Sequence, residues 1–445
     1  MNTTPSVIRS NKTASYTFLF LFLASLSFLG LQAERHESFW LFTAYFISFF
    51  SYVLIVKYCD LSFNLLFVAG VVTRLVLFFS LPGLSDDFYR FIWDGTLLKN
   101  GFNPYAYLPR DVLALNIPGL DQNLFSRLNS PNYYTVYPPL NQLIFYISAI
   151  IGGPESLLTS VNVIRFLILF AELGTLTVLT RIIKNQSIGN SKVLPFWYFL
   201  NPLVILEFTG NLHFEALVIF FIVLALYYFS QRKWLGQGIG LGLAIATKLI
   251  PLILLPFAFF RQWSGKGLWV RLLAGAISVV FFIPLYSSAL IAGMTTSIGL
   301  YFQNFEFNAS IYFLIRALGF MLRGFNMIQT IGPWLAITTF ILVMAWSLYA
   351  SWKGKNIAVS WLFVLGIYWL LSTTIHPWYI ISMIPLGILA GYYFPIVWSF
   401  TIFITYIGYA ETDYHISQGW IALEYLLVLA FFIYEWLEKK KDALH

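Results

Sequence analysis

The sequence predicts an all-α, polytopic membrane protein, a bundle of about 12–14 transmembrane helices. Of its 445 residues, 59% are hydrophobic and only 10% are charged, which is too little charge for the surface of a soluble domain. Continuous apolar runs of about 18–20 residues recur along the chain, and this is the length at which a helix crosses the hydrocarbon core. The strands of a membrane barrel are shorter and alternate in polarity, so these runs exclude a barrel.

Charged residues at the ends of the apolar runs indicate the orientation. Arg9 and Lys12 place the N-terminus inside, and the lysines at 439–441 place the C-terminus inside. No small-residue cleavage site follows the first apolar run, so we interpret it as a retained helix. Two inside termini require an even number of crossings. The predicted segments meet this condition and are residues 15–32, 39–56, 63–81, 161–181, 193–209, 214–230, 235–247, 250–262, 268–288, 330–350, 357–373, 377–393, 395–410 and 418–436.

Two further apolar stretches, 137–151 and 309–322, are interpreted as helices that lie on the outer face. Counting the first as a crossing would move Arg181 and Lys184 outside, and counting the second would do the same to Lys353, against the positive-inside rule. The formal net charge of +7 arises from basic residues that stand singly or in pairs at helix ends. It therefore does not indicate a nucleic-acid partner.

This orientation places two long loops, about residues 82–160 and 289–329, on the outer face. Most of the unusual polar residues fall in these loops or in short connections on the same side, which predicts an outward-facing site. We expect one integral-membrane domain over residues 1–445, with the C-terminal helices of about 395–436 at its periphery.

The stretch "SDDFYRFIWDG" (85–95) opens the first outer loop. Asp86 and Asp87 are adjacent, and Arg90 and Asp94 follow at helical spacing. Arg90 and Asp94 suit the wet face of an interfacial helix. The adjacent carboxylates repel each other, which tends to raise the pKa of one of them and suits a general base.

The stretch "EFTGNLHFEAL" (207–217) joins two apolar segments. Glu207, Asn211 and Glu215 are spaced by four, with His213 between them. Acids at membrane depth are costly and are often functional. The alternative is a solvated turn whose side chains cap the helices.

Three further side chains stand near the outer ends of apolar segments. Lys248, in "KLIPLILLP", either extends to the interface or binds an anion such as a lipid phosphate, and Arg165 presents the same alternatives. His376, in "HPWY", belongs to an interfacial aromatic anchor or lies beside a phosphate.

Other motifs are missing from the sequence. It has no glycine-rich phosphate loop and no nucleotide-binding signature, so an activated donor would arrive from within the membrane. The single cysteine, Cys59, excludes an intramolecular disulfide and a cysteine-based metal site.

Taken in order, these motifs resemble the GT-C superfamily of integral-membrane glycosyltransferases, over about residues 63–395. Asp86-Asp87 match its acidic pair, "YPPLNQ" from Tyr137 its proline-leucine motif, Lys248 its lysine after a short helix, and His376 to Tyr379 its aromatic segment. The bacterial polyprenol-phosphomannose-dependent mannosyltransferases are the most similar branch. One departure is that the acidic pair follows the third predicted helix, whereas in the superfamily it usually follows the first.

The resemblance implies transfer of a hexose, mannose in this branch, from a polyprenyl-phosphate sugar to an acceptor hydroxyl at the outer face of a bacterial inner membrane. Asp86 or Asp87 would act as the base, and the acceptor would be a glycan, a lipid or a protein. Some superfamily members need a divalent metal, but the sequence assigns no metal ligand here. The expected substrate-binding residues are Arg90, Tyr137, Arg165, Asn211, His213, Glu215, Lys248, His376, Trp378 and Tyr379.

Two other functions stay open at this point. A lipid or glycolipid flippase would show polar residues at the midplane and internal symmetry, whereas the polar residues here lie on one side. A polymerase or ligase of polyprenyl-linked glycans would carry arginines and histidines in a late outer loop, whereas the loop at 289–329 is rich in aromatic and amide side chains.

Overall fold

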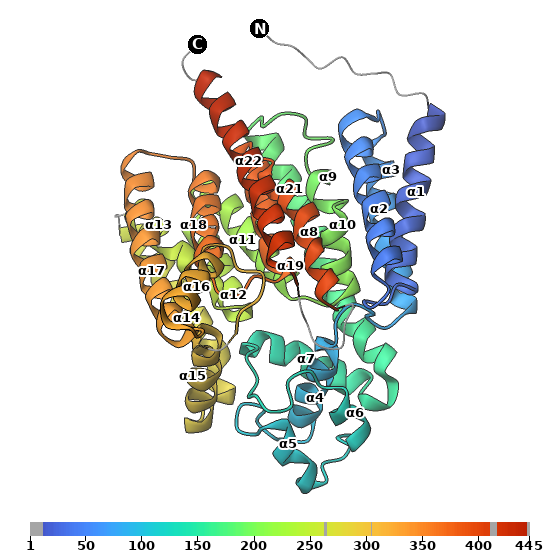
Figure 1. Cartoon of the computed structure of the whole chain (residues 1–445), viewed down its shortest axis with the longest axis vertical. Coiled ribbons are helices and arrows are strands. Elements are labelled where there is room, and N and C mark those ends of the chain that lie inside the picture. Colours follow the sequence, from blue (N-terminus) through green and yellow to red (C-terminus); the bar gives the residue numbers. More distant parts are fainter. Residues whose placement is uncertain (1–11, 262–264, 304, 410–415, 443–445) are drawn as a thin grey trace.

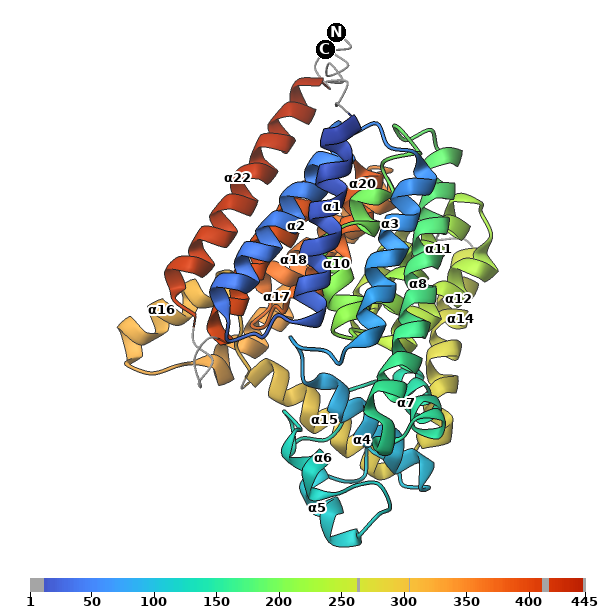
Figure 2. The same cartoon turned by 90° about the vertical axis from the view of Figure 1, so that its right-hand side faces the viewer.

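The computed structural model describes residues 12–261, 265–303, 305–409 and 416–442. Within these ranges it contains helices and one isolated parallel bridge, and no β-strand. The all-α prediction is confirmed. α1 (Lys12–Leu31) begins and α22 (Gln418–Asp442) ends at the same end of the molecule (Figures 1 and 2). This fits the prediction that both termini lie on one side, although Arg9 itself lies outside the described residues.

Six of the described helices are long and apolar enough to cross a membrane, or seven if a pair bent by 117° counts as one span. This confirms a multi-pass membrane protein. The other predicted spans are shorter helices or helix pairs. The predicted 12–14 spans therefore include segments that are shorter than a full membrane crossing. The six lie in α1, α2 (Ser38–Tyr58), α8 (Leu157–Asn185), α14 (Gly265–Phe282), α17 (Ile328–Trp352) and α22.

The shorter helices complete the bundle, and several are broken by proline or by a change of helix type. Pro202 and Pro377 stand at the start of α10 and α19, where a proline lacks only an N–H that the helix does not use. The shorter elements are α3 (Phe63–Val76), η1 (Leu77–Phe79), α9 (Phe196–Phe199), α10 (Pro202–Ile205), η4 (Leu206–Gly210), α11 (Glu215–Ser230), α12 (Trp234–Thr247), η5 (Ile250–Leu254), α13 (Leu255–Arg261), η6 (Ile283–Leu285), α18 (Ile357–Leu371), α19 (Pro377–Ile380), α20 (Met383–Ala390), α21 (Phe394–Thr401) and η7 (Ile402–Tyr409).

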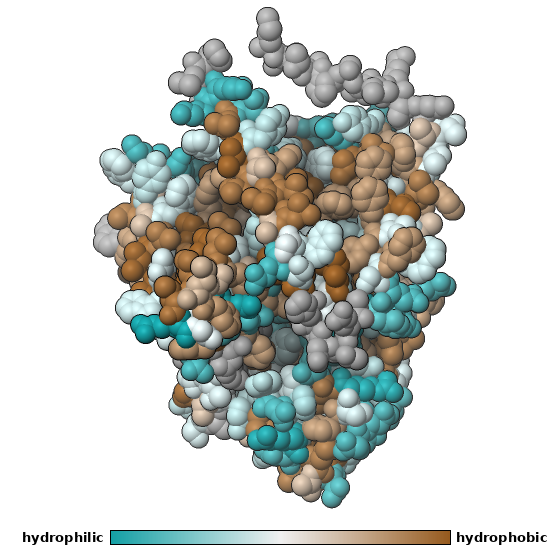
Figure 3. Space-filling model, viewed as in Figure 1, coloured by the Kyte–Doolittle hydropathy of each residue, from teal (hydrophilic) through white to brown (hydrophobic). Residues whose placement is uncertain are grey.

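The loop that was predicted to be the first outer loop folds into a separate layer, at the end of the bundle opposite the start of α1 and the end of α22 (Figures 1 and 2). We call it the outer layer. It contains α4 (Asp87–Lys99), α5 (Pro109–Val112), η2 (Leu113–Leu115), α6 (Gln122–Ser126), α7 (Pro139–Ile151) and η3 (Pro154–Ser156). Hydrophilic side chains gather on this layer, whereas apolar side chains form a broad band over the bundle (Figure 3). The layer therefore has the surface of a part outside the hydrocarbon.

Both stretches that were predicted to lie on the outer face are helices outside the set of long spans. α7 packs on α4, and a side chain at Gly95 would clash with the carbonyl oxygen of Phe145, so glycine permits this close approach. α16 (Ile311–Arg323) exposes Leu318, Met321 and Leu322. The second loop contains α15 (Ser288–Gln303) in addition to α16.

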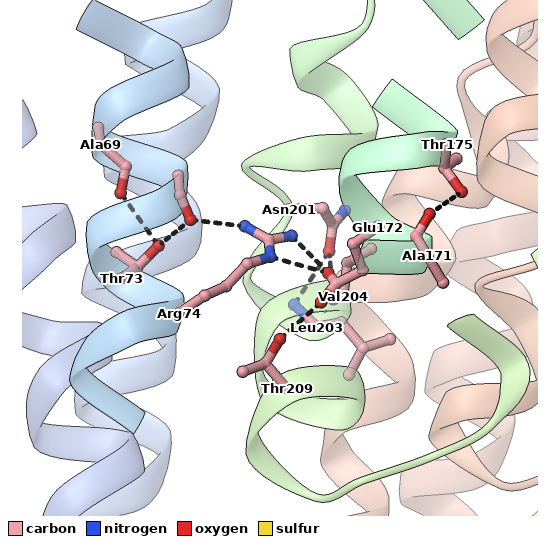
Figure 4. Close-up of polar contacts among 11 residues, drawn as sticks. Ala69, Thr73, Arg74, Ala171, Glu172, Thr175, Asn201, Leu203, Val204 and Thr209 are labelled. Carbon is pink, nitrogen blue, oxygen red and sulfur yellow. Dashed lines mark hydrogen bonds and ion pairs between the residues drawn. The ribbon is translucent and has the colours of Figure 1, made fainter. Parts of the chain in front are cut away.

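A buried ion pair fixes the broken helix that leads into the site (Figure 4). On α3, Arg74 donates to Glu172 of α8 from Nε at 2.9 Å, and both side chains are fully buried. The other carboxylate oxygen of Glu172 accepts from Thr209 Oγ1 at 2.6 Å. Since Thr209 lies in η4, this network holds the π-helical turn, and the residues that follow it, against α3 and α8.

Candidate active site

A cavity of about 350 Å³ lies between the outer layer and the bundle. The first loop, the second loop and the segment before α19 all contribute to its wall. Three parts of the chain that are far apart in sequence therefore meet here. Six of the predicted site residues line it, namely Asp86, Asp87, Arg90, Tyr137, His376 and Trp378.

The two adjacent aspartates have different partners. Asp86 forms an ion pair with Arg35, from the connection between α1 and α2. Asp87 Oδ1 accepts from Asn129 Nδ2 at 2.6 Å, and Asp87 Oδ2 lies 3.7 Å from Nε2 of His213. Burial acts to raise the pKa of Asp87, but the nearby His213 and the hydrogen bond from Asn129 outweigh it, so this pKa lies below its ordinary value. The expected rise is therefore wrong for Asp87.

His213 stands between two carboxylates. Its Nδ1 lies 3.1 Å from Oε2 of Glu207, on the side away from Asp87. Glu207 also accepts from Asn211 Nδ2 at 3.0 Å and from Tyr406 Oη at 2.8 Å. Asn211 and His213 are each only 3% exposed, so the solvated turn considered for this stretch is wrong. This arrangement favours the imidazolium form of His213.

The turn that presents His213 carries backbone strain. η4 ends at Gly210, and Leu212 adopts a left-handed φ of 67°. A branched residue in this region costs free energy and persists only when the surrounding structure enforces it. Two buried carboxylates hold the preceding turn in place. Glu207 belongs to that turn, and Glu172 of α8 accepts a hydrogen bond from Thr209 in it.

A stack of rings forms one wall of the cavity. Trp378 lies between His213 and His376, with ring centroids 3.6 and 4.5 Å away. Phe307 contacts the His376 ring at a centroid distance of 4.4 Å. Burial lowers the pKa of His376 to about 3, so this ring is neutral at physiological pH. His376 Nδ1 is buried without a hydrogen-bond partner, which leaves it available to a bound ligand.

Lys248, Glu215 and Tyr379 lie just behind this wall. Lys248 forms an ion pair with Glu215, and its Nζ lies 4.2 Å from the centroid of the Tyr379 ring. Tyr379 in turn contacts His376, with centroids 5.2 Å apart. The Lys248 side chain keeps 28% of its surface exposed, although it is not among the residues that line the cavity.

Two arginines that were predicted to bind substrate instead form hydrogen bonds within the protein. Arg90 Nε donates to Asp94 at 2.8 Å, and Arg90 Nη1 donates to the carbonyl oxygens of Ser130 and Tyr133. Arg90 and Asp94 are buried, so their assignment to a wet helix face is wrong: the segment around 130–135 covers them. Arg165 donates to the carbonyl oxygens of Ser80, Thr209 and Gly210, and thus holds the end of η4.

Replacing Arg90 with methionine is expected to destabilise the outer layer. The substitution leaves the Asp94 carboxylate buried without its cation, which typically costs about 3–5 kcal/mol of the free energy of unfolding. Thermal unfolding of the purified protein measures the effect. Lys99→Met is the matched control, because Lys99 is an exposed cation at the end of the same helix. Equal stability of the two variants would contradict a structural role for Arg90.

Several site residues were missed by the sequence reasoning. Arg35 lies in a short connection that the positive-inside rule places outside, and an outer arginine beside an acidic pair is the signal that was available. Asn129 and Tyr406 carry no such signal, since each is polar in an ordinary context. Among the residues that the structure describes, no group of three or more His, Cys, Asp or Glu is arranged to hold a metal ion.

Comparison with known proteins identifies the family. The family described as "Alpha-(1->6)-mannopyranosyltransferase, N-terminal domain" matches residues 26–263, more than half of the chain. The chain belongs to this family. The matched region of this mannopyranosyltransferase-family chain includes Asp86, Asp87, His213 and Lys248, whereas His376 lies beyond it. The resemblance to GT-C mannosyltransferases is thereby confirmed.

One relative and the solved structures complete the comparison. "Alpha-(1->6)-mannopyranosyltransferase A" of Corynebacterium glutamicum is 26% identical over 201 residues. That alignment covers 44% of this chain and 38% of the relative, so it spans well under half of either protein. No solved structure matches this chain.

Proposed function

We propose that this protein transfers a mannosyl group from a polyprenyl-phosphate sugar to an acceptor hydroxyl in the cavity, forming an α-(1→6) linkage as the family description states. The observation that carries the proposal is the pairing of Asp87 and His213. Asp87 Oδ2 and His213 Nε2 lie 3.7 Å apart, too far for a direct hydrogen bond; Asp87 lines a ligand-sized cavity, and His213 is buried beside it. An acceptor hydroxyl bound in the cavity can therefore reach Asp87.

Asp87 is the proposed general base. The acceptor oxygen attacks the anomeric carbon, its proton passes to Asp87, and the bond from that carbon to the phosphate oxygen breaks. Asp86 is less suited to this role, because Arg35 holds its Oδ2. His213 keeps Asp87 ionised and oriented before the reaction, while Asn129 fixes its other oxygen.

The leaving phosphate is proposed to face Lys248 and His376. Negative charge grows on the phosphate as the glycosidic bond breaks, and Lys248 stabilises it electrostatically. His376 is neutral and contributes a hydrogen bond from its unpartnered nitrogen. Trp378, which stacks between His213 and His376, offers an aromatic face of the kind that packs on sugar C–H groups.

The donor is proposed to enter from the bilayer at the outer face of a bacterial inner membrane. The cavity lies at the end of the bundle opposite Lys439–Lys441, and a lysine-rich end is typical of the inside. A lipid-linked sugar reaches an outer cavity without a nucleotide-binding domain. The acceptor is proposed to be a glycan, because α-(1→6) linkage requires a sugar hydroxyl or its equivalent.

A transfer assay with a panel of donors tests this function. Membranes that contain the protein are given polyprenyl-phosphate mannose, glucose or arabinose, or GDP-mannose, with an α-mannoside acceptor. Transfer is expected from polyprenyl-phosphate mannose and to exceed that from the other donors. Transfer that requires GDP-mannose and does not occur with the lipid donor would overturn the donor assignment.

The pH dependence tests the role of His213. Replacing His213 with glutamine removes the main influences that lower the pKa of Asp87, while burial remains, so this pKa rises. Since the base acts in its ionised form, the acidic limb of the kcat profile is expected to move to higher pH. A limb at the wild-type pH, in a variant that still turns over, would contradict the proposed pairing.

A further inference from the structure

One side of the cavity is a short wall segment, residues 305–308, that has little regular structure of its own. It is tied to the connection before α19: Phe307 N donates to the Thr373 carbonyl oxygen at 3.0 Å, and Ile375 N donates to the Phe307 carbonyl oxygen at 2.8 Å. Thr374 Oγ1 donates to the Phe305 carbonyl oxygen at 3.0 Å. The position of the wall segment therefore fixes the position of the His376 ring that Phe307 contacts.

The last residue of the wall segment, Asn308, is held by α22, which lies more than a hundred residues further along the chain. Both carboxylate oxygens of Glu424 accept from Asn308 Nδ2, at 3.2 and 3.1 Å. Tyr425 Oη donates to the Asn308 carbonyl oxygen at 2.6 Å. Two neighbouring residues of α22 thus hold the side chain and the main chain of Asn308. Asn308 is fully buried and adopts a left-handed φ of 45°.

Burying the carboxyl group of Glu424 costs free energy. It is 1% exposed in the second turn of a candidate membrane span, Gln418–Asp442, where a buried carboxylate is costly and usually has a specific role. Its hydrogen bonds within the described structure go to Asn308 and to Trp398 Nε1, at 2.8 Å for the latter. Glu435, on the same helix, serves a different purpose, since it accepts from the backbone N–H groups of Tyr393 and Phe394.

We propose that Glu424 is a positioning residue for the cavity, which acts through Asn308 and the wall segment to hold His376 at the ligand. The chain of contacts runs from Glu424 to Asn308, from Phe307 to His376, and then into the cavity. Glu424 lies outside the part of the chain that the family description covers. The consequence for activity rests on the proposed function, whereas the consequence for the position of the wall does not.

Thiol labelling tests the position of the wall without any substrate. In a Cys59→Ser background, the substitution Thr374→Cys places a thiol in the cavity lining next to the wall segment, where Thr374 is 4% exposed. The loss of the Thr374 hydrogen bond to Phe305 is common to every variant compared, so it does not affect the ratio of their rates. Glu424→Gln is expected to speed labelling by a small maleimide by about fivefold or more, because the wall opens more often. Tyr425→Phe removes one hydrogen bond to Asn308 and is expected to act in the same direction. Glu435→Gln is the matched control and is expected to leave the rate unchanged.

The outcomes of this experiment separate the possibilities. Unchanged labelling in both Glu424→Gln and Tyr425→Phe, or equal acceleration in Glu435→Gln, would overturn the proposal. If Glu424→Gln does not fold, Tyr425→Phe alone decides. Faster labelling in a protein whose wild type transfers no sugar would support the positioning role and would refute the proposed function instead.

A double-mutant cycle then tests the route through Asn308. Glu424→Gln and Asn308→Ala are each expected to lower kcat/KM for the donor by about tenfold, and the double variant is expected to be no worse than either single variant. Thermal midpoints measured in parallel show whether a variant has lost activity through a general loss of stability. Effects that multiply in the double variant would show that Glu424 does not act through Asn308.

Discussion

Replacing Asp87 with asparagine is expected to lower kcat by about 10³-fold, the largest effect of any single substitution in the cavity. Asparagine keeps the shape of the side chain and can still contact Asn129, but it cannot accept the proton of the acceptor hydroxyl. The substrate-binding groups stay in place, so KM for the donor is expected to change little. Steady-state kinetics with polyprenyl-phosphate mannose measure both constants.

Asp86→Asn is the matched comparison, since the two aspartates are neighbours and both line the cavity. Its expected loss is about tenfold, because it disturbs the ion pair with Arg35 but leaves the base in place. The reverse order, with Asp86→Asn inactive and Asp87→Asn active, would assign the base to Asp86. Activity in both variants would exclude a carboxylate base from this pair.

Replacing Lys248 with methionine is expected to lower kcat by about 10²-fold. The lysine is proposed to stabilise charge that develops only as the phosphate leaves, and loss of one such group typically costs two to three orders of magnitude. Methionine preserves most of the unbranched apolar stem but lacks the Nζ that lies over the Tyr379 ring, so packing is largely kept. Single-turnover measurements of donor cleavage report the chemical step directly.

Two variants control the Lys248 experiment. Lys248→Arg keeps the positive charge and is expected to retain much more activity than Lys248→Met. Glu215→Gln removes the carboxylate that now pairs with the lysine, and it is expected to preserve the chemical step. A Lys248→Met protein with wild-type turnover would show that the leaving phosphate does not face this lysine.

The apolar runs predicted where helices form, because apolar length and periodicity are local properties of the sequence. They did not predict which helices span fully. α12 has 14 residues and ends before Lys248, and the next helical turn, η5, contains Pro251. Hydropathy alone does not distinguish such a segment from a complete span. Helical spacing likewise paired Arg90 with Asp94, but whether they face water depends on the loop that folds over them.

The charge pattern assigned the polar motifs to one side of the membrane and so predicted that they lie close together. Asp86, Asp87, His213 and His376 do lie close together in the candidate site. The partners that decide their chemistry were not predictable, since Glu424 and Asn308 are brought together only by the tertiary fold. Arg165 shows the opposite case: its position near the outer end of a helix suggested a ligand site, whereas the carbonyl groups of a broken helix occupy it.

The most direct measurement of the central proposal is an experimental structure with a C-phosphonate analogue of polyprenyl-phosphate mannose, which cannot be cleaved. The proposed function predicts the sugar in the cavity beside Asp87 and His213, with the phosphonate toward Lys248 and His376. Mannose bound at another part of the protein, or a phosphonate remote from Lys248, would contradict it.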